Sequence, residues 1–89
     1  MVRSRRRIPK THLAAFAERL KSARITANFA SGTDFAYKIG VAPAAYWRWE
    51  RGEVWPSGHD LISVSRETGY SIHWLLTGEA PMRLTDRAD

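Results

Sequence analysis

The segment 43–51 holds the residues with the clearest capacity for recognition chemistry. Its guanidinium groups, on Arg48 and Arg51, lie three positions apart, so a helix here would present both on one side. A guanidinium can span O6 and N7 of guanine with two hydrogen bonds. At about 100° per residue the same side also holds Pro43, Ala44 and Trp47. The opposite side holds Tyr46, Trp49 and Glu50. We therefore expect a helix with one core face and one working face.

A basic cluster stands at the start of the chain. The net charge is +5, and the first ten residues account for all of it because they hold five bases and no acid: Arg3, Arg5, Arg6, Arg7 and Lys10. Clustered like charges favour an arm, residues 1–11, that orders against a polyanion, and nucleic acid is the obvious polyanion. A solubilising tail is the alternative that the charge alone leaves open.

Composition argues against several other classes of protein. The chain has 89 residues and no cysteine, which excludes a disulfide framework and thiolate zinc sites. No apolar run approaches the roughly 18 residues of a membrane span. The histidines, His12, His59 and His73, lack metal-ligand spacing, and no phosphate-cradling glycine loop or nucleophile motif is present. We expect no enzyme, no metal, no cofactor and no membrane partner.

Helical periodicity and caps predict an all-α protein. We expect helices over 12–27, 33–39, 43–51, 58–68 and 72–77, capped at their starts by Thr11, Ser31, Ser57 and Ser71. Left-handed residues should end the helices, namely Asn28, Gly40, Gly52, Gly69 and Gly78. The helices form one domain over 12–80, followed by a tail, 81–89, that we expect to fray from residue 82.

The predicted core has few members, as suits so short a chain. Phe16, Phe35, Tyr46 and Trp49 should pack tightly and leave no ligand pocket. On the helix over 58–68 we expect Leu61, Ile62, Val64 and Thr68 to point inward. A carboxylate at Glu50, on the core side of its helix, would be costly to bury without a partner.

The combined motifs resemble the Cro/C1-type (XRE) helix-turn-helix domain over roughly residues 13–80. The matching stretches are 38–42, 46–52, 56–57, 61–62, 69–72 and 74–78. The resemblance implies a compact five-helix, lambda-repressor-like bundle in which 40–42 is the turn. It also implies that Pro43, Ala44, Trp47 and Arg48 approach base edges in the major groove. Pro43 and Ala44 offer only apolar contact, so DNA shape could supply part of the readout.

The family pattern implies roles for further residues. The phosphate-binding candidates are Thr33, Lys38, Arg51 and Trp55. Arg24 matches the family's paired arginine, and we expect it to form a structural ion pair with Glu50; a contact from Glu50 to cytosine is the alternative. Two interpretations of Trp47 stay open. It contacts DNA, or it covers the preceding helix near Tyr37.

Family members commonly act as dimers on two half-sites. The candidate dimer surface consists of Ile72, His73, Trp74, Leu76, Met82 and Leu84. We therefore expect a sequence-specific transcriptional regulator, a repressor or autorepressor that binds an inverted-repeat operator in double-stranded DNA. It would work in the cytoplasm, on the nucleoid, encoded by a bacterium or a phage.

Other functions stay open at this point. One is an antitoxin that neutralises a toxin and regulates its own operon, and another is a helix-turn-helix fold that has lost DNA binding. An antirepressor partner, or a longer repressor of which this chain is a part, is also compatible with the sequence.

Overall fold

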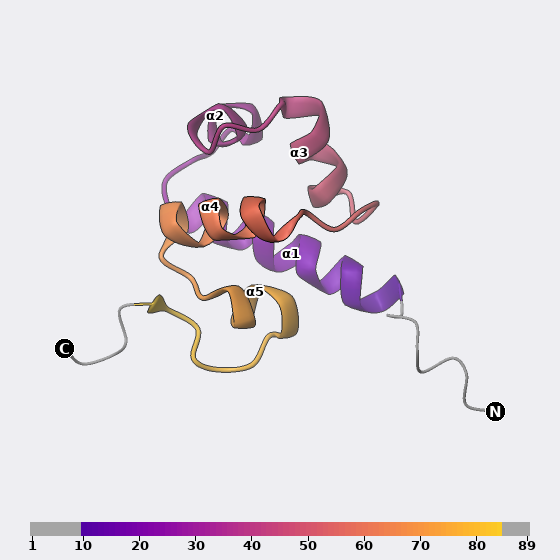
Figure 1. Cartoon of the computed structure of the whole chain (residues 1–89), viewed down its shortest axis with the longest axis vertical. Coiled ribbons are helices and arrows are strands. Elements are labelled where there is room, and N and C mark those ends of the chain that lie inside the picture. The colour runs from indigo at the N-terminus through magenta and orange to yellow at the C-terminus, as the bar shows by residue number, and fades with distance from the viewer. Residues whose placement is uncertain (1–9, 85–89) are drawn as a thin grey trace.

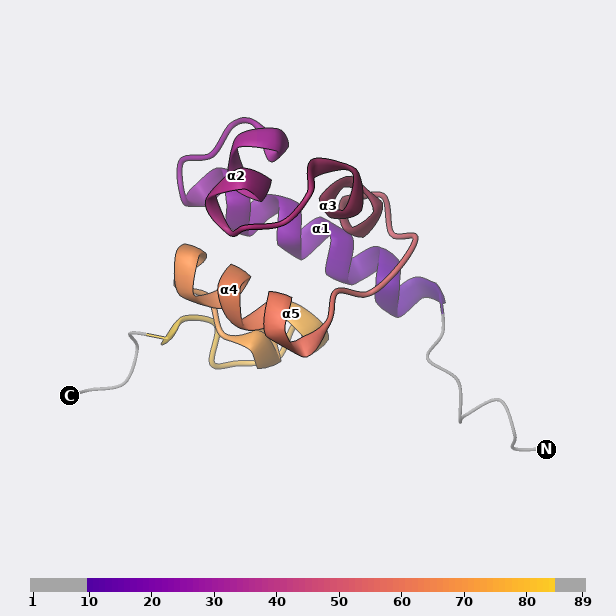
Figure 2. The ribbon, with the colours of Figure 1, turned by 45° about the horizontal axis from the view of Figure 1, so that its top comes forward.

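The computed structural model describes residues 10–84, of which five segments are helical. These are α1 (Lys10–Thr26), α2 (Gly32–Lys38), α3 (Pro43–Glu50), α4 (Gly58–Thr68) and α5 (Ile72–Thr77). α1 contacts α3, α4 and α5, and α2 packs on α3 (Figure 1). In Figure 2, α2 and α3 lie on one side of the long α1, and α4 and α5 lie on the other. The predicted five-helix, all-α fold is confirmed.

Serine caps and left-handed residues set the helix limits. The hydroxyls of Ser31, Ser57 and Ser71 each accept a hydrogen bond from a backbone N–H three residues on, at 3.0–3.1 Å. Gly69 and Gly78 end α4 and α5 with φ of 81° and 79°. Both of these helices therefore have the predicted limits, and α2 is shifted by one residue.

The two ends of α1 differ in how well the sequence predicts them. Asn28 is left-handed, with φ 74°, as predicted, and the Phe29 N–H bonds the Arg24 carbonyl at 3.1 Å. At the other end, α1 begins at Lys10, so Thr11 lies inside the helix and the prediction of an N-cap there is wrong. A threonine fits a helical first turn without steric conflict, so its capping preference alone does not fix the start. The arginines of the arm lie outside the described residues.

The core lies between α1 and the four shorter helices. Its largest fully buried side chains are Phe16, Leu20, Phe35, Tyr46, Val64 and Leu75. On α4 the buried positions are 61, 64, 65 and 68, a regular helical stripe. Ile62 falls outside this stripe and is 44% exposed, so the prediction that it points inward is wrong.

The chain after α5 returns to the start of α5. The Ser71 N–H donates to the Met82 carbonyl at 2.7 Å, and the Leu84 N–H donates to the Gly69 carbonyl at 2.8 Å. Residues 82–84 thus pair with 69–71 instead of fraying as expected. So short a pairing leaves no alternating pattern in the sequence from which it could be predicted. Residues 85–89 lie outside the described part.

An arginine on α1 fastens α5 to the rest of the fold. Arg19 donates from Nε to the Leu75 carbonyl at 2.9 Å and from Nη2 to the Leu76 carbonyl at 3.1 Å. These carbonyls lie in the last turn of α5 and lack helical partners. Burial lowers the pKa of Arg19.

Within residues 10–84, no helix combines the length and the apolar content that a membrane-spanning segment needs.

Candidate nucleic-acid interface

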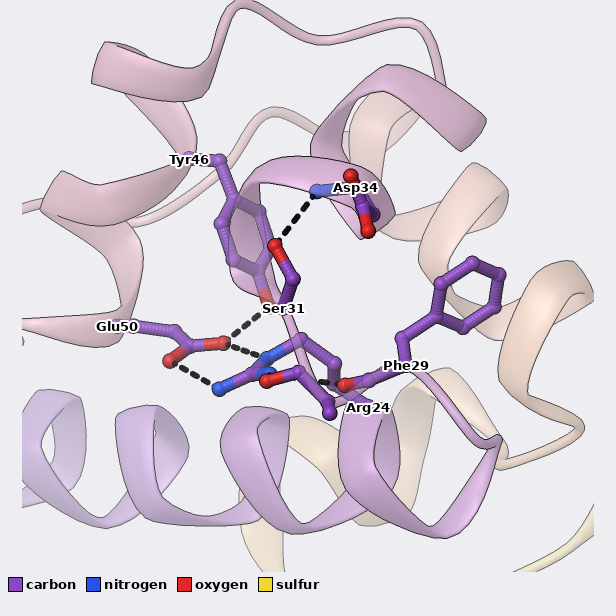
Figure 3. Close-up of polar contacts among 7 residues, drawn as sticks. Arg24, Phe29, Ser31, Asp34, Tyr46 and Glu50 are labelled. Carbon is purple, nitrogen blue, oxygen red and sulfur yellow. Dashed lines mark hydrogen bonds and ion pairs between the residues drawn. The ribbon is translucent and has the colours of Figure 1, made fainter.

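A buried ion pair holds the inner face of α3 against α1. Arg24 Nε donates to Glu50 Oε2 at 2.7 Å and Arg24 Nη2 to Glu50 Oε1 at 3.2 Å; both side chains are only 4% exposed. The Tyr46 hydroxyl donates to the same carboxylate (Figure 3). The hydrogen bond to Glu50 raises the pKa of Arg24, and burial raises that of the Tyr46 hydroxyl. The expected pair is therefore present, and in this structure Glu50 is turned away from the outer face.

The same arginine also fastens the loop that leads into α2. Arg24 Nη1 donates to the carbonyls of Phe29 and Ala30, at 2.8 and 2.7 Å. Phe29 then packs edge-to-face on Phe35 of α2, with ring centroids 5.1 Å apart. One side chain thus holds both the loop before α2 and the inner face of α3 against α1.

The outer face of α3 is open to solvent. Pro43 occupies the first turn, after an N-cap at Ala42 that makes no side-chain bond. Ala44 is exposed, and the side chains of Arg48 and Arg51 are 55% and 58% exposed. The division into a buried face, with Tyr46 and Trp49, and an exposed face is the one that the sequence predicts.

Trp47 rests on α2 at a place that the sequence did not indicate. A Cβ built on Gly32 would lie 2.6 Å from Trp47 Cη2 and 2.8 Å from Cζ2, so the indole lies directly over this glycine. Tyr37, the neighbour considered from the sequence, is 69% exposed. Of the two interpretations, the structure favours the covering one, but with Gly32 as the surface covered. The glycine is required because any side chain would collide with the ring.

Glu53 is a charged residue of this face that the sequence analysis missed. Its Oε2 accepts from Arg51 Nε at 2.7 Å, and its Oε1 lies 3.4 Å from Arg48 Nε. The hydrogen bond from Arg51 lowers the pKa of the carboxyl group. A signal was available, because a glycine after a helix predicts a turn that folds the next residue back along it.

The phosphate-binding candidates are spread around the two ends of α2 and the loop after α3. Thr33 is half-buried in the first turn of α2, and Lys38 is exposed at its end. Trp55 lies in the loop, where its ring packs on Phe16 with centroids 5.2 Å apart.

No group of acids and histidines within the described residues could hold a metal ion.

The predicted dimer surface is divided between core and solvent. Ile72, Trp74 and Leu76 are half-buried and pack against the core, and Trp74 also stacks on Tyr70 at 4.9 Å. His73 is exposed, and its Nε2 lies 3.2 Å from Glu79 Oε1. Met82 and Leu84 are each 41% exposed.

Comparison with known proteins places this arrangement in a family. A family model described as helix-turn-helix matches residues 17–75. The chain belongs to the Cro/C1-type helix-turn-helix family. α2, the turn and α3 are the helix-turn-helix of this chain, and Gly40, with φ 78°, lies in the turn.

A curated relative comes from Haemophilus influenzae and is described as an uncharacterized helix-turn-helix-type transcriptional regulator. It is 43% identical over 47 residues, which are 53% of this chain. The aligned part spans 20% of the relative's length. No solved structure shows a significant match.

Removing Arg24 should destabilise the helix-turn-helix strongly. Arg24→Met leaves the Glu50 carboxylate buried without its cation, and we expect a loss of about 3–5 kcal/mol in the free energy of unfolding, measured with urea. The double variant Arg24→Met/Glu50→Met should recover part of this loss. The exposed Arg66→Met is the matched control and should change little. A cost for Arg24→Met no greater than that of the control contradicts the account.

Gly32→Ala should destabilise the contact between α2 and α3. The added methyl meets the Trp47 ring, and overpacking of this kind costs about 1–3 kcal/mol. Gly58→Ala is a matched control, since Gly58 is also the first residue of its helix and has open space around its Cβ position. We expect the midpoint of thermal unfolding to fall for Gly32→Ala and not for Gly58→Ala. Adding Trp47→Leu to Gly32→Ala should remove the collision and restore part of the lost midpoint. Equal midpoints for the two alanine variants would show that Trp47 does not rest on Gly32.

Proposed function

We propose that this chain is a sequence-specific DNA-binding transcriptional regulator, a repressor or autorepressor that binds an inverted repeat as a dimer. The observation that carries the proposal is the division of α3. Its inner face is held by the buried pair of Arg24 and Glu50, while Ala44 and Arg48 are exposed on its other side. The placement of α3 in the major groove is taken from the phage repressors of this family.

Arg48 is the principal base-reading residue in this proposal. Its guanidinium is half exposed and can bond guanine O6 and N7 together, which is worth about 1–3 kcal/mol of discrimination. Pro43 and Ala44 supply apolar contact, for example to a thymine methyl group. Trp47 acts chiefly by holding α2 against α3, because its ring lies over Gly32.

Phosphates are bound on both sides of the reading helix. Thr33, at the start of α2, offers a hydroxyl and a backbone N–H, and Lys38 offers charge. Arg51 offers guanidinium donors, although Glu53 balances its charge. Trp55 contributes less to phosphate binding than these residues, since its ring is packed on Phe16. The basic arm supplies the remaining contacts, because the rest of the chain is neutral.

Two copies of the chain would meet through the α5 region. Met82 and Leu84 are exposed apolar side chains on the segment that pairs with residues 69–71, next to the start of α5. On α5 itself, His73 is exposed, and the half-buried Ile72, Trp74 and Leu76 contribute the parts of their side chains that reach solvent. Half-sites one helical turn apart, about 34–36 Å, are the expectation for such a dimer.

Selection from a library of random-sequence DNA duplexes tests the proposal. The chain should enrich an inverted repeat and bind it at least about a thousandfold more tightly than a shuffled duplex. Arg48→Ala should lose discrimination at one base position per half-site, by about 1–3 kcal/mol, whereas Arg66→Ala should keep it. Enrichment of no sequence would overturn the proposal and favour a protein-binding role such as that of an antitoxin.

Deleting residues 2–7 should weaken binding to selected and shuffled duplexes alike. Four arginines are lost, so the slope of log K against log salt should become shallower by at most about 4, at about 0.9 for each phosphate contact. Titrations at several salt concentrations measure this slope. An unchanged slope together with unchanged affinity would show that the arm does not contact DNA.

A further inference from the structure

A carboxylate lies among the arginines of the outer face of α3. Glu53 accepts from Arg51 Nε at 2.7 Å, and Arg51 Nη2 lies 3.4 Å from its other oxygen. Arg48 Nε lies 3.4 Å from that second oxygen. The three side chains are 44–58% exposed, so the cluster is part of the surface that the proposed function turns towards DNA.

The backbone, and not only side-chain flexibility, brings Glu53 to this place. Gly52 takes φ 72°, the Gly52 N–H bonds the Trp49 carbonyl at 3.1 Å, and the Glu53 N–H bonds the Arg48 carbonyl at 2.9 Å. This is the hydrogen-bond pattern of a Schellman turn, in which the residue after the glycine commonly makes an apolar contact with the helix. Here the ion pair with Arg48 stands where that contact would be.

An acid at this position has two electrostatic effects on binding to DNA. It cancels the charge that Arg51 would otherwise bring to phosphates, and phosphates attract arginine in any sequence. It also repels phosphates directly, so that close approach is favourable only when other contacts compensate for the repulsion. Both effects weaken sequence-independent binding.

The ion pair between this acid and Arg48 involves Nε, the inner nitrogen of the guanidinium group. The two terminal nitrogens are the ones that face acceptors beyond the end of the side chain. Guanine presents two such acceptors, O6 and N7, in the major groove. The 3.4 Å separation of Arg48 Nε and Glu53 Oε1 is an ion pair between exposed groups, which favours, without fixing, side-chain directions that turn Nε towards Glu53.

We propose that Glu53 is a specificity-determining residue of this chain. It orients Arg48 through Nε for contact with guanine, and it neutralises Arg51 so that contact with phosphates of unrelated sequence is weak. The inference rests on the proposed function, because it requires that the outer face of α3 meets DNA. It adds an acidic residue to a surface otherwise defined by basic and apolar ones.

Glu53→Gln tests the inference, because glutamine keeps the shape and one acceptor oxygen but removes the charge. The probes are the inverted-repeat duplex selected by the wild-type chain and a shuffled duplex, each titrated at several salt concentrations. We expect tighter binding to the shuffled duplex, a ratio of affinities that falls about three- to tenfold, and a salt slope steeper by about 0.9. Glu18→Gln, an exposed residue on α1, makes the same charge change away from α3 and should leave the ratio within about twofold.

The outcomes separate this inference from the function on which it rests. If the wild-type chain selects a sequence and Glu53→Gln keeps the wild-type ratio, the inference is overturned and the proposed function stands. If the wild-type chain selects no sequence, the proposed function fails first. Circular dichroism of the variant at each temperature used establishes that it is folded, as expected for the loss of an exposed ion pair.

Discussion

The arrangement of this domain depends on one buried guanidinium. Arg24 and Glu50 are each 4% exposed, and neither charge could be left there without its partner. Because Arg24 also donates to the carbonyls of Phe29 and Ala30, it joins α1, α3 and the loop before α2. A rotation of α3 about its axis would separate the Glu50 carboxylate from Arg24, and it would carry Tyr46, on the same helix, out of the core. The rotation of α3, and hence the identity of its outer face, is therefore strongly constrained.

The outer face is shaped by two contacts that follow from this constraint. Once Tyr46 and Trp49 are buried, the intervening Trp47 must lie to the side, and the absence of a side chain at Gly32 gives it room against α2. After α3 ends at Glu50, the left-handed turn at Gly52 returns Glu53 to Arg48. The surface offered to a ligand is thus a short row of small and basic residues, bordered by an indole on one side and a carboxylate on the other.

The sequence predicts features that are encoded locally and misses those that depend on packing. The limits of α4 and α5 follow from a serine before each helix and a glycine after it, and the Arg24–Glu50 pair follows from the family pattern together with the cost of a buried acid. Ile62 was misplaced because residues one position apart on a helix differ by only about 100° in direction. The contact between Trp47 and Gly32, and the pairing of residues 82–84 with 69–71, join segments whose approach is set by the whole fold.

We propose that the outer face of α3, held in place by the buried pair, is the surface that meets DNA. Amide chemical shifts of the ¹⁵N-labelled chain, followed by NMR during titration with the selected duplex, test it most directly. We predict that the largest shift changes fall on residues 43–53 and on the first turn of α2. The amide chemical shifts of the α1 core face, around Phe16 and Leu20, should change little. Changes centred on α4 or on the exposed side of α1, with α3 unaffected, would show that DNA is bound by another surface.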